Sequence, residues 1–453
     1  MASMDVDFDS LEARESDIAA SAAHPETARL LSELDRRQLA RKIALPTNDG
    51  EVRARLRELD EPVTLFGAVF SNLSTFTNLG SQIGDTRAIS AVRFSPDSSM
   101  LLTGSWTGQA KLWSVPSCKE VRVLKAHKER IGGVAWHPEA TLSQSASAVN
   151  FATSGADNDV KLWNLESDTS LRTLSGHESR VCRVNFHPSG RYLGSASYDG
   201  TWRLWDVERG DELLLQEGHS KEVYAIAFQG DGALVASGGL DAIARVWDLR
   251  SGRTALVLSG HSRDILSIDF SPNGYQVATG SNDDTIRVWD LRMHQAIATI
   301  PGHKSAISDV KFFHAPPSRD RERYPLTEVP RAFDAMDAFS GAGFGAGAGA
   351  GANGEAKKEE GEGTSEEAKP DVYAPGDDSR PDFPVSGSFL VSSGFDGYVK
   401  VWSADDWQQV RAMANDEAGK VMSVDVSSDA RFIAAGQYDK TFKLYSDPNV
   451  DLA

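Results

Sequence analysis

Histidine, hydroxyl and aspartate side chains recur together along this chain at spacings that could build a hydrolase. In each set a Ser or Thr stands four residues before an Asp, a Trp stands six residues after it, and a His precedes them all. A His–Asp pair of this kind activates one hydroxyl as the nucleophile of a serine hydrolase. The five sets are His127, Thr153, Asp157 and Trp163; His177, Ser195, Asp199 and Trp205; His219, Ser237, Asp241 and Trp247; His261, Thr279, Asp283 and Trp289; and His303, Ser392, Asp396 and Trp402.

Five copies of one set argue against catalysis. An enzyme needs a single asymmetric site with a distinguished nucleophile, whereas a group present in every unit belongs to the repeated architecture. The Trp N–H can donate to the hydroxyl, the hydroxyl can bond one imidazole nitrogen, and the other nitrogen can bond the carboxylate. We therefore predict buried structural sets, no catalytic residue, no cofactor and no metal site.

Evenly spaced repeat units must position these residues. A Gly-His pair opens three successive units, beginning with His177. The step from Trp205 to Trp247 and the step from there to Trp289 are both 42 residues. A period of about 40 to 45 residues with Gly-His and Trp-Asp signatures is typical of the four-stranded blade of a β-propeller.

The same period extends in both directions and gives seven units. Trp113 follows Thr107 by six residues in the first unit, and Tyr445 follows Asp439 by six residues in the last. Two units are longer than the rest, which places one insertion near 140–150 and another between residues 313 and 388.

The predicted fold is an all-β, seven-bladed propeller over residues 72–446. Only eight residues follow Tyr445, too few and too polar for the outermost strand of the last blade, so residues 72–80 are expected to supply it and close the ring. The insertion at 314–386 within blade six is Gly/Ala-rich and then charged, and we expect a disordered acidic loop. Residues 1–24 are small and acidic and are expected to be disordered too.

Residues 25–67 are predicted to be a partly helical N-terminal extension that ends in NDGEVRARLRELDEPVTLFG. Asp49 can cap a short helix there with Val52 and Leu59 on one face. Because so short a helix is marginal in water, it should order only against another surface, either a partner or the chain's own propeller. The candidate partner-binding residues are Arg53, Arg55, Leu56, Arg57, Pro62, Leu65 and Phe66.

Four aromatic residues break the repeat at one position. The residue before each signature Asp should lie on the turn beside the Gly-His loops, and in four units it is aromatic: Trp106, Tyr198, Phe395 and Tyr438. Blades six, seven and one are neighbours in a closed ring, so three of these should form an arc. Clustered exposed aromatics suit protein-binding hot spots; the alternative is packing against adjacent turns.

Composition limits the classes of partner. The formal net charge of −18 repels nucleic-acid phosphate as a whole, so RNA contact should be local or carried by a partner. Cys118 and Cys182 fall in different units, which predicts neither a disulfide framework nor a zinc site. No apolar run is long enough for a bilayer and the N-terminus is acidic, so we expect an intracellular, soluble protein without a membrane partner or small-molecule substrate.

The chain resembles the WD-repeat splicing factors of the U4/U6 small nuclear ribonucleoprotein, the Prp4-type family. The similarity rests on the 48–67 motif and on phrases such as HPSGRYLGSASYDGTWRLWD, GGLDAIARVWDLR and SSDARFIAAGQYDKTFKLY. It implies a nuclear, non-enzymatic scaffold that joins the tri-snRNP. The implied partners are a second U4/U6 splicing protein and a cyclophilin-type isomerase, with U4/U6 snRNA met mostly through partners. The disordered insertion in blade six departs from the family pattern.

A second hypothesis comes from the ends of two adjacent units. Trp247-Asp248-Leu249-Arg250 and Trp289-Asp290-Leu291-Arg292 resemble the adaptor-binding signature of substrate receptors of cullin-type ubiquitin ligases. The same arginines also fit ordinary repeat chemistry.

Overall fold

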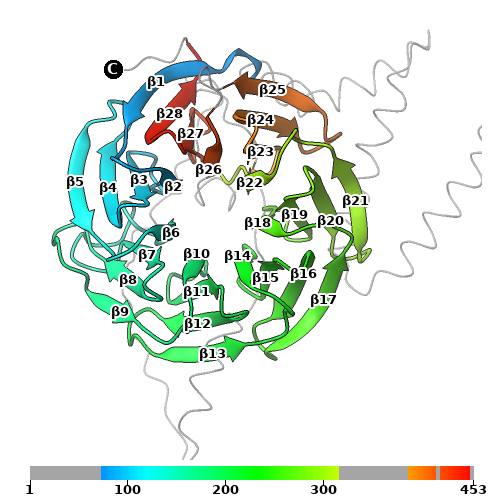
Figure 1. The fold of residues 1–453 in the computed structure, drawn as a ribbon, viewed down its shortest axis with the longest axis horizontal. Helices are drawn as coiled ribbons and strands as arrows, with labels where there is room; N and C mark the ends of the chain where they lie inside the picture. Colours follow the sequence, from blue (N-terminus) through cyan, green and yellow to red (C-terminus); the bar gives the residue numbers. More distant parts are fainter. Residues whose placement is uncertain (1–72, 316–385, 415–418, 449–453) are drawn as a thin grey trace, which may run out of the picture. The chain divides into compact units, whose positions relative to one another are not determined.

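The computed structural model describes residues 73–315, 386–414 and 419–448, all within the compact unit Ala68–Ala453. These residues form seven four-stranded antiparallel sheets, arranged as blades around a central opening (Figure 1). The predicted all-β, seven-bladed propeller is confirmed. The predicted segments 1–24 and 25–67 and nearly all of the 314–386 insertion lie outside the described residues.

Each blade runs outwards from its first strand, next to the opening, to its fourth strand at the rim (Figure 1). Blades one and two comprise β2 (Ile89–Phe94), β3 (Met100–Ser105), β4 (Gln109–Ser114), β5 (Glu120–Lys125), β6 (Ile131–Trp136), β7 (Phe151–Gly155), β8 (Val160–Trp163) and β9 (Arg172–Leu174). Blades three and four comprise β10 (Val181–Phe186), β11 (Tyr192–Ser197), β12 (Trp202–Asp206), β13 (Glu212–Gln216), β14 (Val223–Phe228), β15 (Leu234–Gly239), β16 (Ile243–Asp248) and β17 (Arg253–Ser259). Blades five and six comprise β18 (Ile265–Phe270), β19 (Gln276–Ser281), β20 (Ile286–Asp290), β21 (Gln295–Ile300), β22 (Ile307–Phe312), β23 (Phe389–Gly394), β24 (Tyr398–Ser403) and β25 (Gln409–Ala414). Blade seven comprises β26 (Val421–Val426), β27 (Phe432–Gln437), β28 (Thr441–Ser446) and β1 (Thr77–Ile83).

The hydrophobic core lies between neighbouring blades. Trp205 on β12 of blade three, for example, clusters with Ala152 and Leu162 of blade two, and Trp113 of blade one clusters with Phe442 of blade seven. Inner strands read as small or apolar runs because both faces are covered, whereas outer strands such as β5 alternate and are largely exposed. Each blade therefore buries its faces only through its neighbours.

The last blade is closed by the strand that precedes the first. β1 pairs antiparallel with β28, from Thr77 opposite Ser446 to Ile83 opposite Thr441. The strand begins five residues later than the predicted 72–80, because residues 73–75 form a helical turn. Leu73 and Phe76 are apolar and bury in the core of blades six and seven instead of joining the sheet.

A charged bridge near the axis ties the closing blades together. Arg93 of blade one donates from Nη1 and Nη2 to Asp309 Oδ2 of blade six, at 3.1 Å each. Ser423 of blade seven donates to the same oxygen at 2.8 Å. Asp309 is buried, which raises its pKa, but the positive charges of Arg93, Arg183 and Lys311 and the bond from Ser423 lower the pKa overall. The bridge fixes three blades around the seam.

The two insertions predicted in blades two and six are connected to their blades in different ways. Near 140–150, turns fold back on Asn150, whose buried Nδ2 donates to the carbonyls of Ser145, Ala146 and Ala148. In blade six the two ends of the longer insertion lie side by side: Gly387 N–H donates to Phe313 O at 2.8 Å. Successive connections in an antiparallel sheet lie at opposite ends, so this insertion leaves on the face opposite the signature turns.

Candidate functional site

All five predicted sets of side chains come together in the structure. In blade three, Trp205 Nε1 donates to Ser195 Oγ at 2.8 Å, and that hydroxyl lies 2.7 Å from His177 Nε2. His177 Nδ1 lies 2.7 Å from Asp199 Oδ2, which also accepts the backbone N–H of Glu178 at 3.2 Å. The Asp199 carboxylate thus links the Gly-His loop to the signature turn through two hydrogen bonds.

The other four sets repeat this geometry closely. Imidazole Nε2 lies 2.9 Å from Thr153, 2.7 Å from Ser237, 2.7 Å from Thr279 and 2.8 Å from Ser392. The indole N–H donates to the same hydroxyls at 2.8 to 3.0 Å. The His Nδ1 to Asp bonds measure 2.8, 3.1, 2.9 and 2.9 Å for His127, His219, His261 and His303, with Asp157, Asp241, Asp283 and Asp396.

The bonds within each set satisfy polar groups that are buried. Burial alone would raise the pKa of Asp396, but bonds from His303 and from the Lys304 N–H lower the pKa to about 2. Because an ionised carboxylate only accepts, His303 Nδ1 donates to it and Nε2 accepts from Ser392. That hydroxyl is fully buried and also accepts the Trp402 N–H. A hydroxyl enclosed in this way cannot reach a substrate.

Blade one carries a different set that sequence reasoning missed. Trp113 still donates to Thr103 at 2.9 Å, but the His position holds Asp85, which accepts from the hydroxyls of Ser105 and Thr107. The signal was present, because Asp85 precedes Thr107 by the 22 residues that separate His from Asp elsewhere. Two hydroxyls and a carboxylate here replace the imidazole bridge.

The four aromatic residues lie at one end of the blades. The backbone N–H of each donates to the residue just before the first strand of its blade, from Trp106 to Ala88 at 3.0 Å in blade one and equivalently for Tyr198, Phe395 and Tyr438. The rings of Trp106 and Tyr438 meet edge to face, with centroids 5.5 Å apart. Tyr438 is half exposed, at 51 %.

Three of these rings line one hollow on the axis of the propeller. Trp106, Tyr198 and Phe395 border a cavity of about 210 Å³. Every blade contributes the second residue of its first strand, which places the cavity at the mouth of the central channel: Ser90, Gly132, Cys182, Tyr224, Leu266, Ser308 and Met422. Tyr438 does not line this cavity, but its ring contacts that of Trp106, which does.

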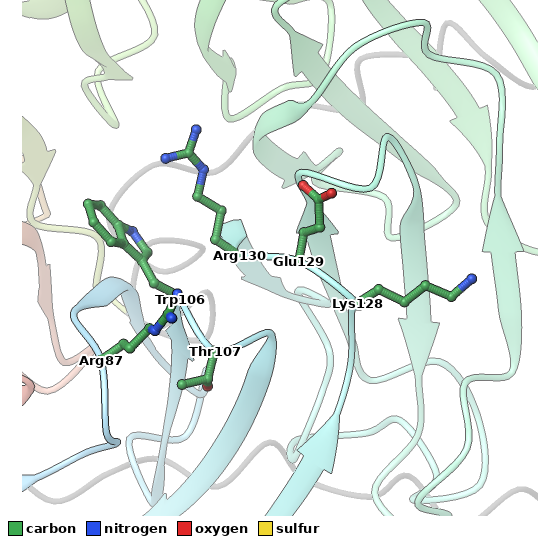
Figure 2. Close-up of a pocket in the computed structure, with 6 residues that line it drawn as sticks. All are labelled: Arg87, Trp106, Thr107, Lys128, Glu129 and Arg130. Atoms are coloured by element: carbon green, nitrogen blue, oxygen red, sulfur yellow. The ribbon is translucent and has the colours of Figure 1, made fainter.

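Cations accompany the aromatic rings, and sequence reasoning did not single them out. The Arg130 guanidinium lies 5.8 Å from the Trp106 ring, and Arg180 lies 3.4 Å from Tyr198. A second hollow of about 670 Å³ beside Trp106 is lined by Arg87, Lys128, Arg130, Thr107 and Glu129. Figure 2 shows the Arg130 side chain extending beside the Trp106 ring, while Lys128 points away from both.

The arginines of the possible ubiquitin-ligase signature differ in environment. Arg292 donates from Nη2 to Asp290 at 2.6 Å and lies 3.6 Å from the Tyr275 ring, within its own blade. Arg250 is exposed. The Arg292 guanidinium is therefore held within its own blade, and the Arg250 side chain is the exposed one of the pair. This difference gives little support to the ubiquitin-ligase hypothesis, in which both arginines bind an adaptor.

In the described ranges, a metal ion would need several ligating side chains close together, and a membrane span would need a long apolar helix. No three His, Cys, Asp or Glu side chains gather there as a metal ion would require. Among the described residues, no helix is long and apolar enough to cross a lipid bilayer. Arg53, Arg55, Leu56, Arg57, Pro62, Leu65 and Phe66 lie outside the described residues.

The sequence pattern of the WD domain, G-beta repeat matches residues 76–114, 118–164, 168–206, 210–248, 252–290, 381–403 and 407–446. These segments make up more than half of the chain. The chain belongs to the WD-repeat family. In this WD-repeat protein the matched segments include all the signature turns and Trp strands described above, and every described His loop except that of His303.

Within the WD-repeat family, the chain is similar to a particular group of proteins. Over 261 residues the WD-repeat protein is 36% identical to the U4/U6 small nuclear ribonucleoprotein Prp4 of Bos taurus, covering 38% of this chain and 50% of the relative. Over 130 residues it is 32% identical to the U4/U6 small nuclear ribonucleoprotein PRP4 of Saccharomyces cerevisiae, covering 27% and 26%. The chain spans about half the length, or less, of the curated relatives it matches. The resemblance to Prp4-type WD-repeat splicing factors is confirmed.

Proposed function

We propose that this WD-repeat protein is a non-catalytic scaffold of the U4/U6 and U4/U6.U5 tri-snRNP that acts in pre-mRNA splicing in the nucleus. The observation that carries the proposal is its similarity to proteins named as U4/U6 small nuclear ribonucleoprotein Prp4 in mammals, yeast and a plant. Shared blade sequence of this kind favours a shared role in assembly, since the blades are the interacting parts of a propeller.

The buried sets support a scaffold without enzymatic activity. In blades two to six the hydroxyl is fully enclosed and bonded on two sides. The accessible features are the channel mouth and its aromatic and cationic side chains. Aromatic and Arg side chains are the types enriched at protein-binding hot spots.

Two protein contacts are proposed. The 48–67 motif, with Arg55 and Leu56 at its centre, docks a second U4/U6 splicing protein. The aromatic residues of the signature turns, Trp106, Tyr198, Phe395 and Tyr438, bind a protein on the propeller face. A cyclophilin-type isomerase is a further partner. With a net charge of −18, the chain meets U4/U6 snRNA mostly through these proteins.

Purification from nuclear extract tests the proposal. The tagged full chain should enrich U4 and U6 RNA together, and RNA sequencing of the eluate measures this. An Arg55→Glu, Leu56→Asp variant should lose the RNA along with the second splicing protein, whereas Arg253→Glu on the outer strand β17 should retain both. Good recovery of the protein without U4 and U6 RNA would refute the proposed function.

A further inference from the structure

The cavity at the channel mouth is lined by two charged side chains, and both are arginines. Among the described residues that border this space of about 210 Å³, Arg130 and Arg180 carry charge and all the others are apolar, aromatic, hydroxyl or thiol residues. Neither Glu222 nor Asp264, which precede the first strands of blades four and five, lines it, and nor does the basic residue beside each. The cavity is therefore positively charged.

Aromatic rings hold the two guanidinium groups in place. Arg180 lies over the Tyr198 ring, 3.4 Å from its centroid, and Arg130 lies 5.8 Å from that of Trp106. Both rings line the cavity together with the arginines. A guanidinium that stacks on a ring keeps the N–H donors at its edge free for planar, bidentate bonds to an oxyanion.

No carboxylate of the described residues neutralises either arginine. None lies at ion-pair distance from Arg130 or Arg180. Glu129 lines the neighbouring hollow but not this cavity, and in Figure 2 its side chain and that of Arg130 extend in different directions. Asp199 is already bonded to His177. Because guanidinium groups stay charged in proteins, the cavity favours an anion.

The sign of the charge excludes a cationic ligand. Aromatic residues around a mouth can hold a methylated lysine through cation–π contacts. Here the protein supplies the cations itself, because Arg130 and Arg180 lie against two of the rings and Lys420 lies 5.3 Å from the Phe395 ring. A further cation would be repelled.

The aromatic contacts also disfavour a nucleic acid. Single-stranded RNA binds proteins by stacking its bases on free aromatic faces. Arg180 covers one face of Tyr198, and the Trp106 ring already contacts both Arg130 and Tyr438. A protein side chain needs no such stacking.

The size of the cavity suits one side chain. Sites that enclose small organic ligands measure about 300 to 1,000 Å³, and this cavity is smaller. The adjoining hollow of about 670 Å³ shares Trp106 and Arg130 with it. A segment that lies in the larger hollow can therefore place one of its side chains in the smaller one.

We infer that the cavity binds the carboxylate of one Glu or Asp side chain on an extended segment of a partner protein. Arg130 and Arg180 donate to the carboxylate oxygens, and the Trp106 and Tyr198 rings enclose its aliphatic part. This inference rests on the proposed scaffold function and specifies the chemical group that the propeller face recognises on its protein partner.

A binding assay with the purified full chain tests this inference. The probe is the peptide Gly-Ser-Leu-Glu-Leu-Ser-Gly with an amidated C-terminus and an uncharged fluorophore, and two control peptides carry Gln or Lys in place of Glu. By fluorescence anisotropy at low salt, the Glu peptide should bind about tenfold more tightly than the Gln peptide. The Lys peptide should bind most weakly.

Variants of the protein identify the binding groups. Arg130→Met and Arg180→Met should each weaken binding of the Glu peptide by about tenfold and leave that of the Gln peptide unchanged. Arg253→Met removes the same charge from the exposed outer strand β17 and should change neither. Arg180→Glu should make the protein prefer the Lys peptide to the Glu peptide, a reversal that a folding defect would not produce.

Four results would overturn the inference. The first is equal affinity for the Glu and Gln peptides, and the second is a loss of binding in Arg253→Met as large as that in Arg130→Met. The third is an oligouridylate that binds more tightly than the Glu peptide and loses affinity in Arg180→Met. The fourth is binding about tenfold tighter in the variant Asp5→Asn, Asp7→Asn, Asp9→Asn, since the chain's own acidic N-terminus would then compete for the cavity in place of a partner.

The outcome is independent of the particle itself. If the Glu and Gln peptides are not distinguished while the protein still enriches U4 and U6 RNA, only the inference is wrong. If the Glu peptide is preferred but the RNA is absent, the proposed function is wrong and the cavity keeps its specificity.

Discussion

Removing one buried hydroxyl should measurably destabilise the whole propeller. Ser195→Ala takes away the acceptor of the Trp205 N–H and the partner of His177 Nε2, which lie 2.8 and 2.7 Å from the hydroxyl. Water cannot replace it, because Ser195 is fully buried. Leaving a buried polar group without a partner costs about 1 to 3 kcal/mol, so two such groups should lower the free energy of unfolding by about 2 to 6 kcal/mol.

Thermal denaturation followed by circular dichroism measures the effect. For a propeller of about 300 residues this free energy corresponds to a fall in Tm of about 3 to 10 °C. Ser195→Thr is the matched control, because blades two and five carry Thr153 and Thr279 at the same position. It keeps the hydroxyl and should lie close to the wild type.

A double variant tests the cause of the change. Trp205→Phe removes the donor, so adding it to Ser195→Ala should cost less than the sum of the two single changes. If Ser195→Ala is as stable as Ser195→Thr, or if the two changes are additive, the hydrogen-bonded set is not the stabilising unit. Loss of a hydrolytic activity at unchanged Tm would instead favour catalysis.

Three further perturbations test other parts of the structure. The pKa of Asp396 lies at about 2, below the usual value of 3.8, so its contribution to stability should be present above about pH 4 and lost as the pH falls towards 2; Asp396→Asn should flatten this part of a plot of denaturation midpoint against pH. Asp309→Ala should leave the Arg93 guanidinium without its carboxylate and lower the free energy of unfolding by about 3 to 5 kcal/mol in a denaturant titration, and a fall below about 1 kcal/mol would contradict the bridging role. Replacing Arg250 and Arg292 with Ala should leave recovery of U4 and U6 RNA unchanged; loss of a cullin adaptor from the same pull-down would favour the ubiquitin-ligase hypothesis.

Much of the fold could be predicted from the sequence because the same residue spacing recurs in every repeat unit. The Trp and Asp spacing fixes a strand and a turn in each unit, and the same hydrogen bonds recur wherever His, Ser or Thr, Asp and Trp are all present. In blade one Asp85 takes the place of His and Thr107 takes the place of the signature Asp, so the bonds differ there. The closing strand was placed five residues early because a strand pattern does not reveal that Leu73 and Phe76 bury in the core.

The candidate site was less accessible to sequence reasoning. The position of the aromatic residues follows from the repeat, but the cations over them come from loops whose side-chain directions depend on neighbouring blades. Arg130 approaches Trp106 from the next blade, across a gap that no local pattern describes.

Closure by β1 has a consequence for synthesis of the protein. The strand's partner, β28, begins at Thr441, so about 360 residues must follow Ile83 out of the ribosome before the two can pair. At about 5 to 20 residues per second this takes about 20 to 70 s, far longer than a strand needs to find a neighbour that is already present. During translation the nascent chain therefore holds β1 with an unsatisfied edge, a period in which a chaperone would shield it and a premature stop codon would leave it permanently open.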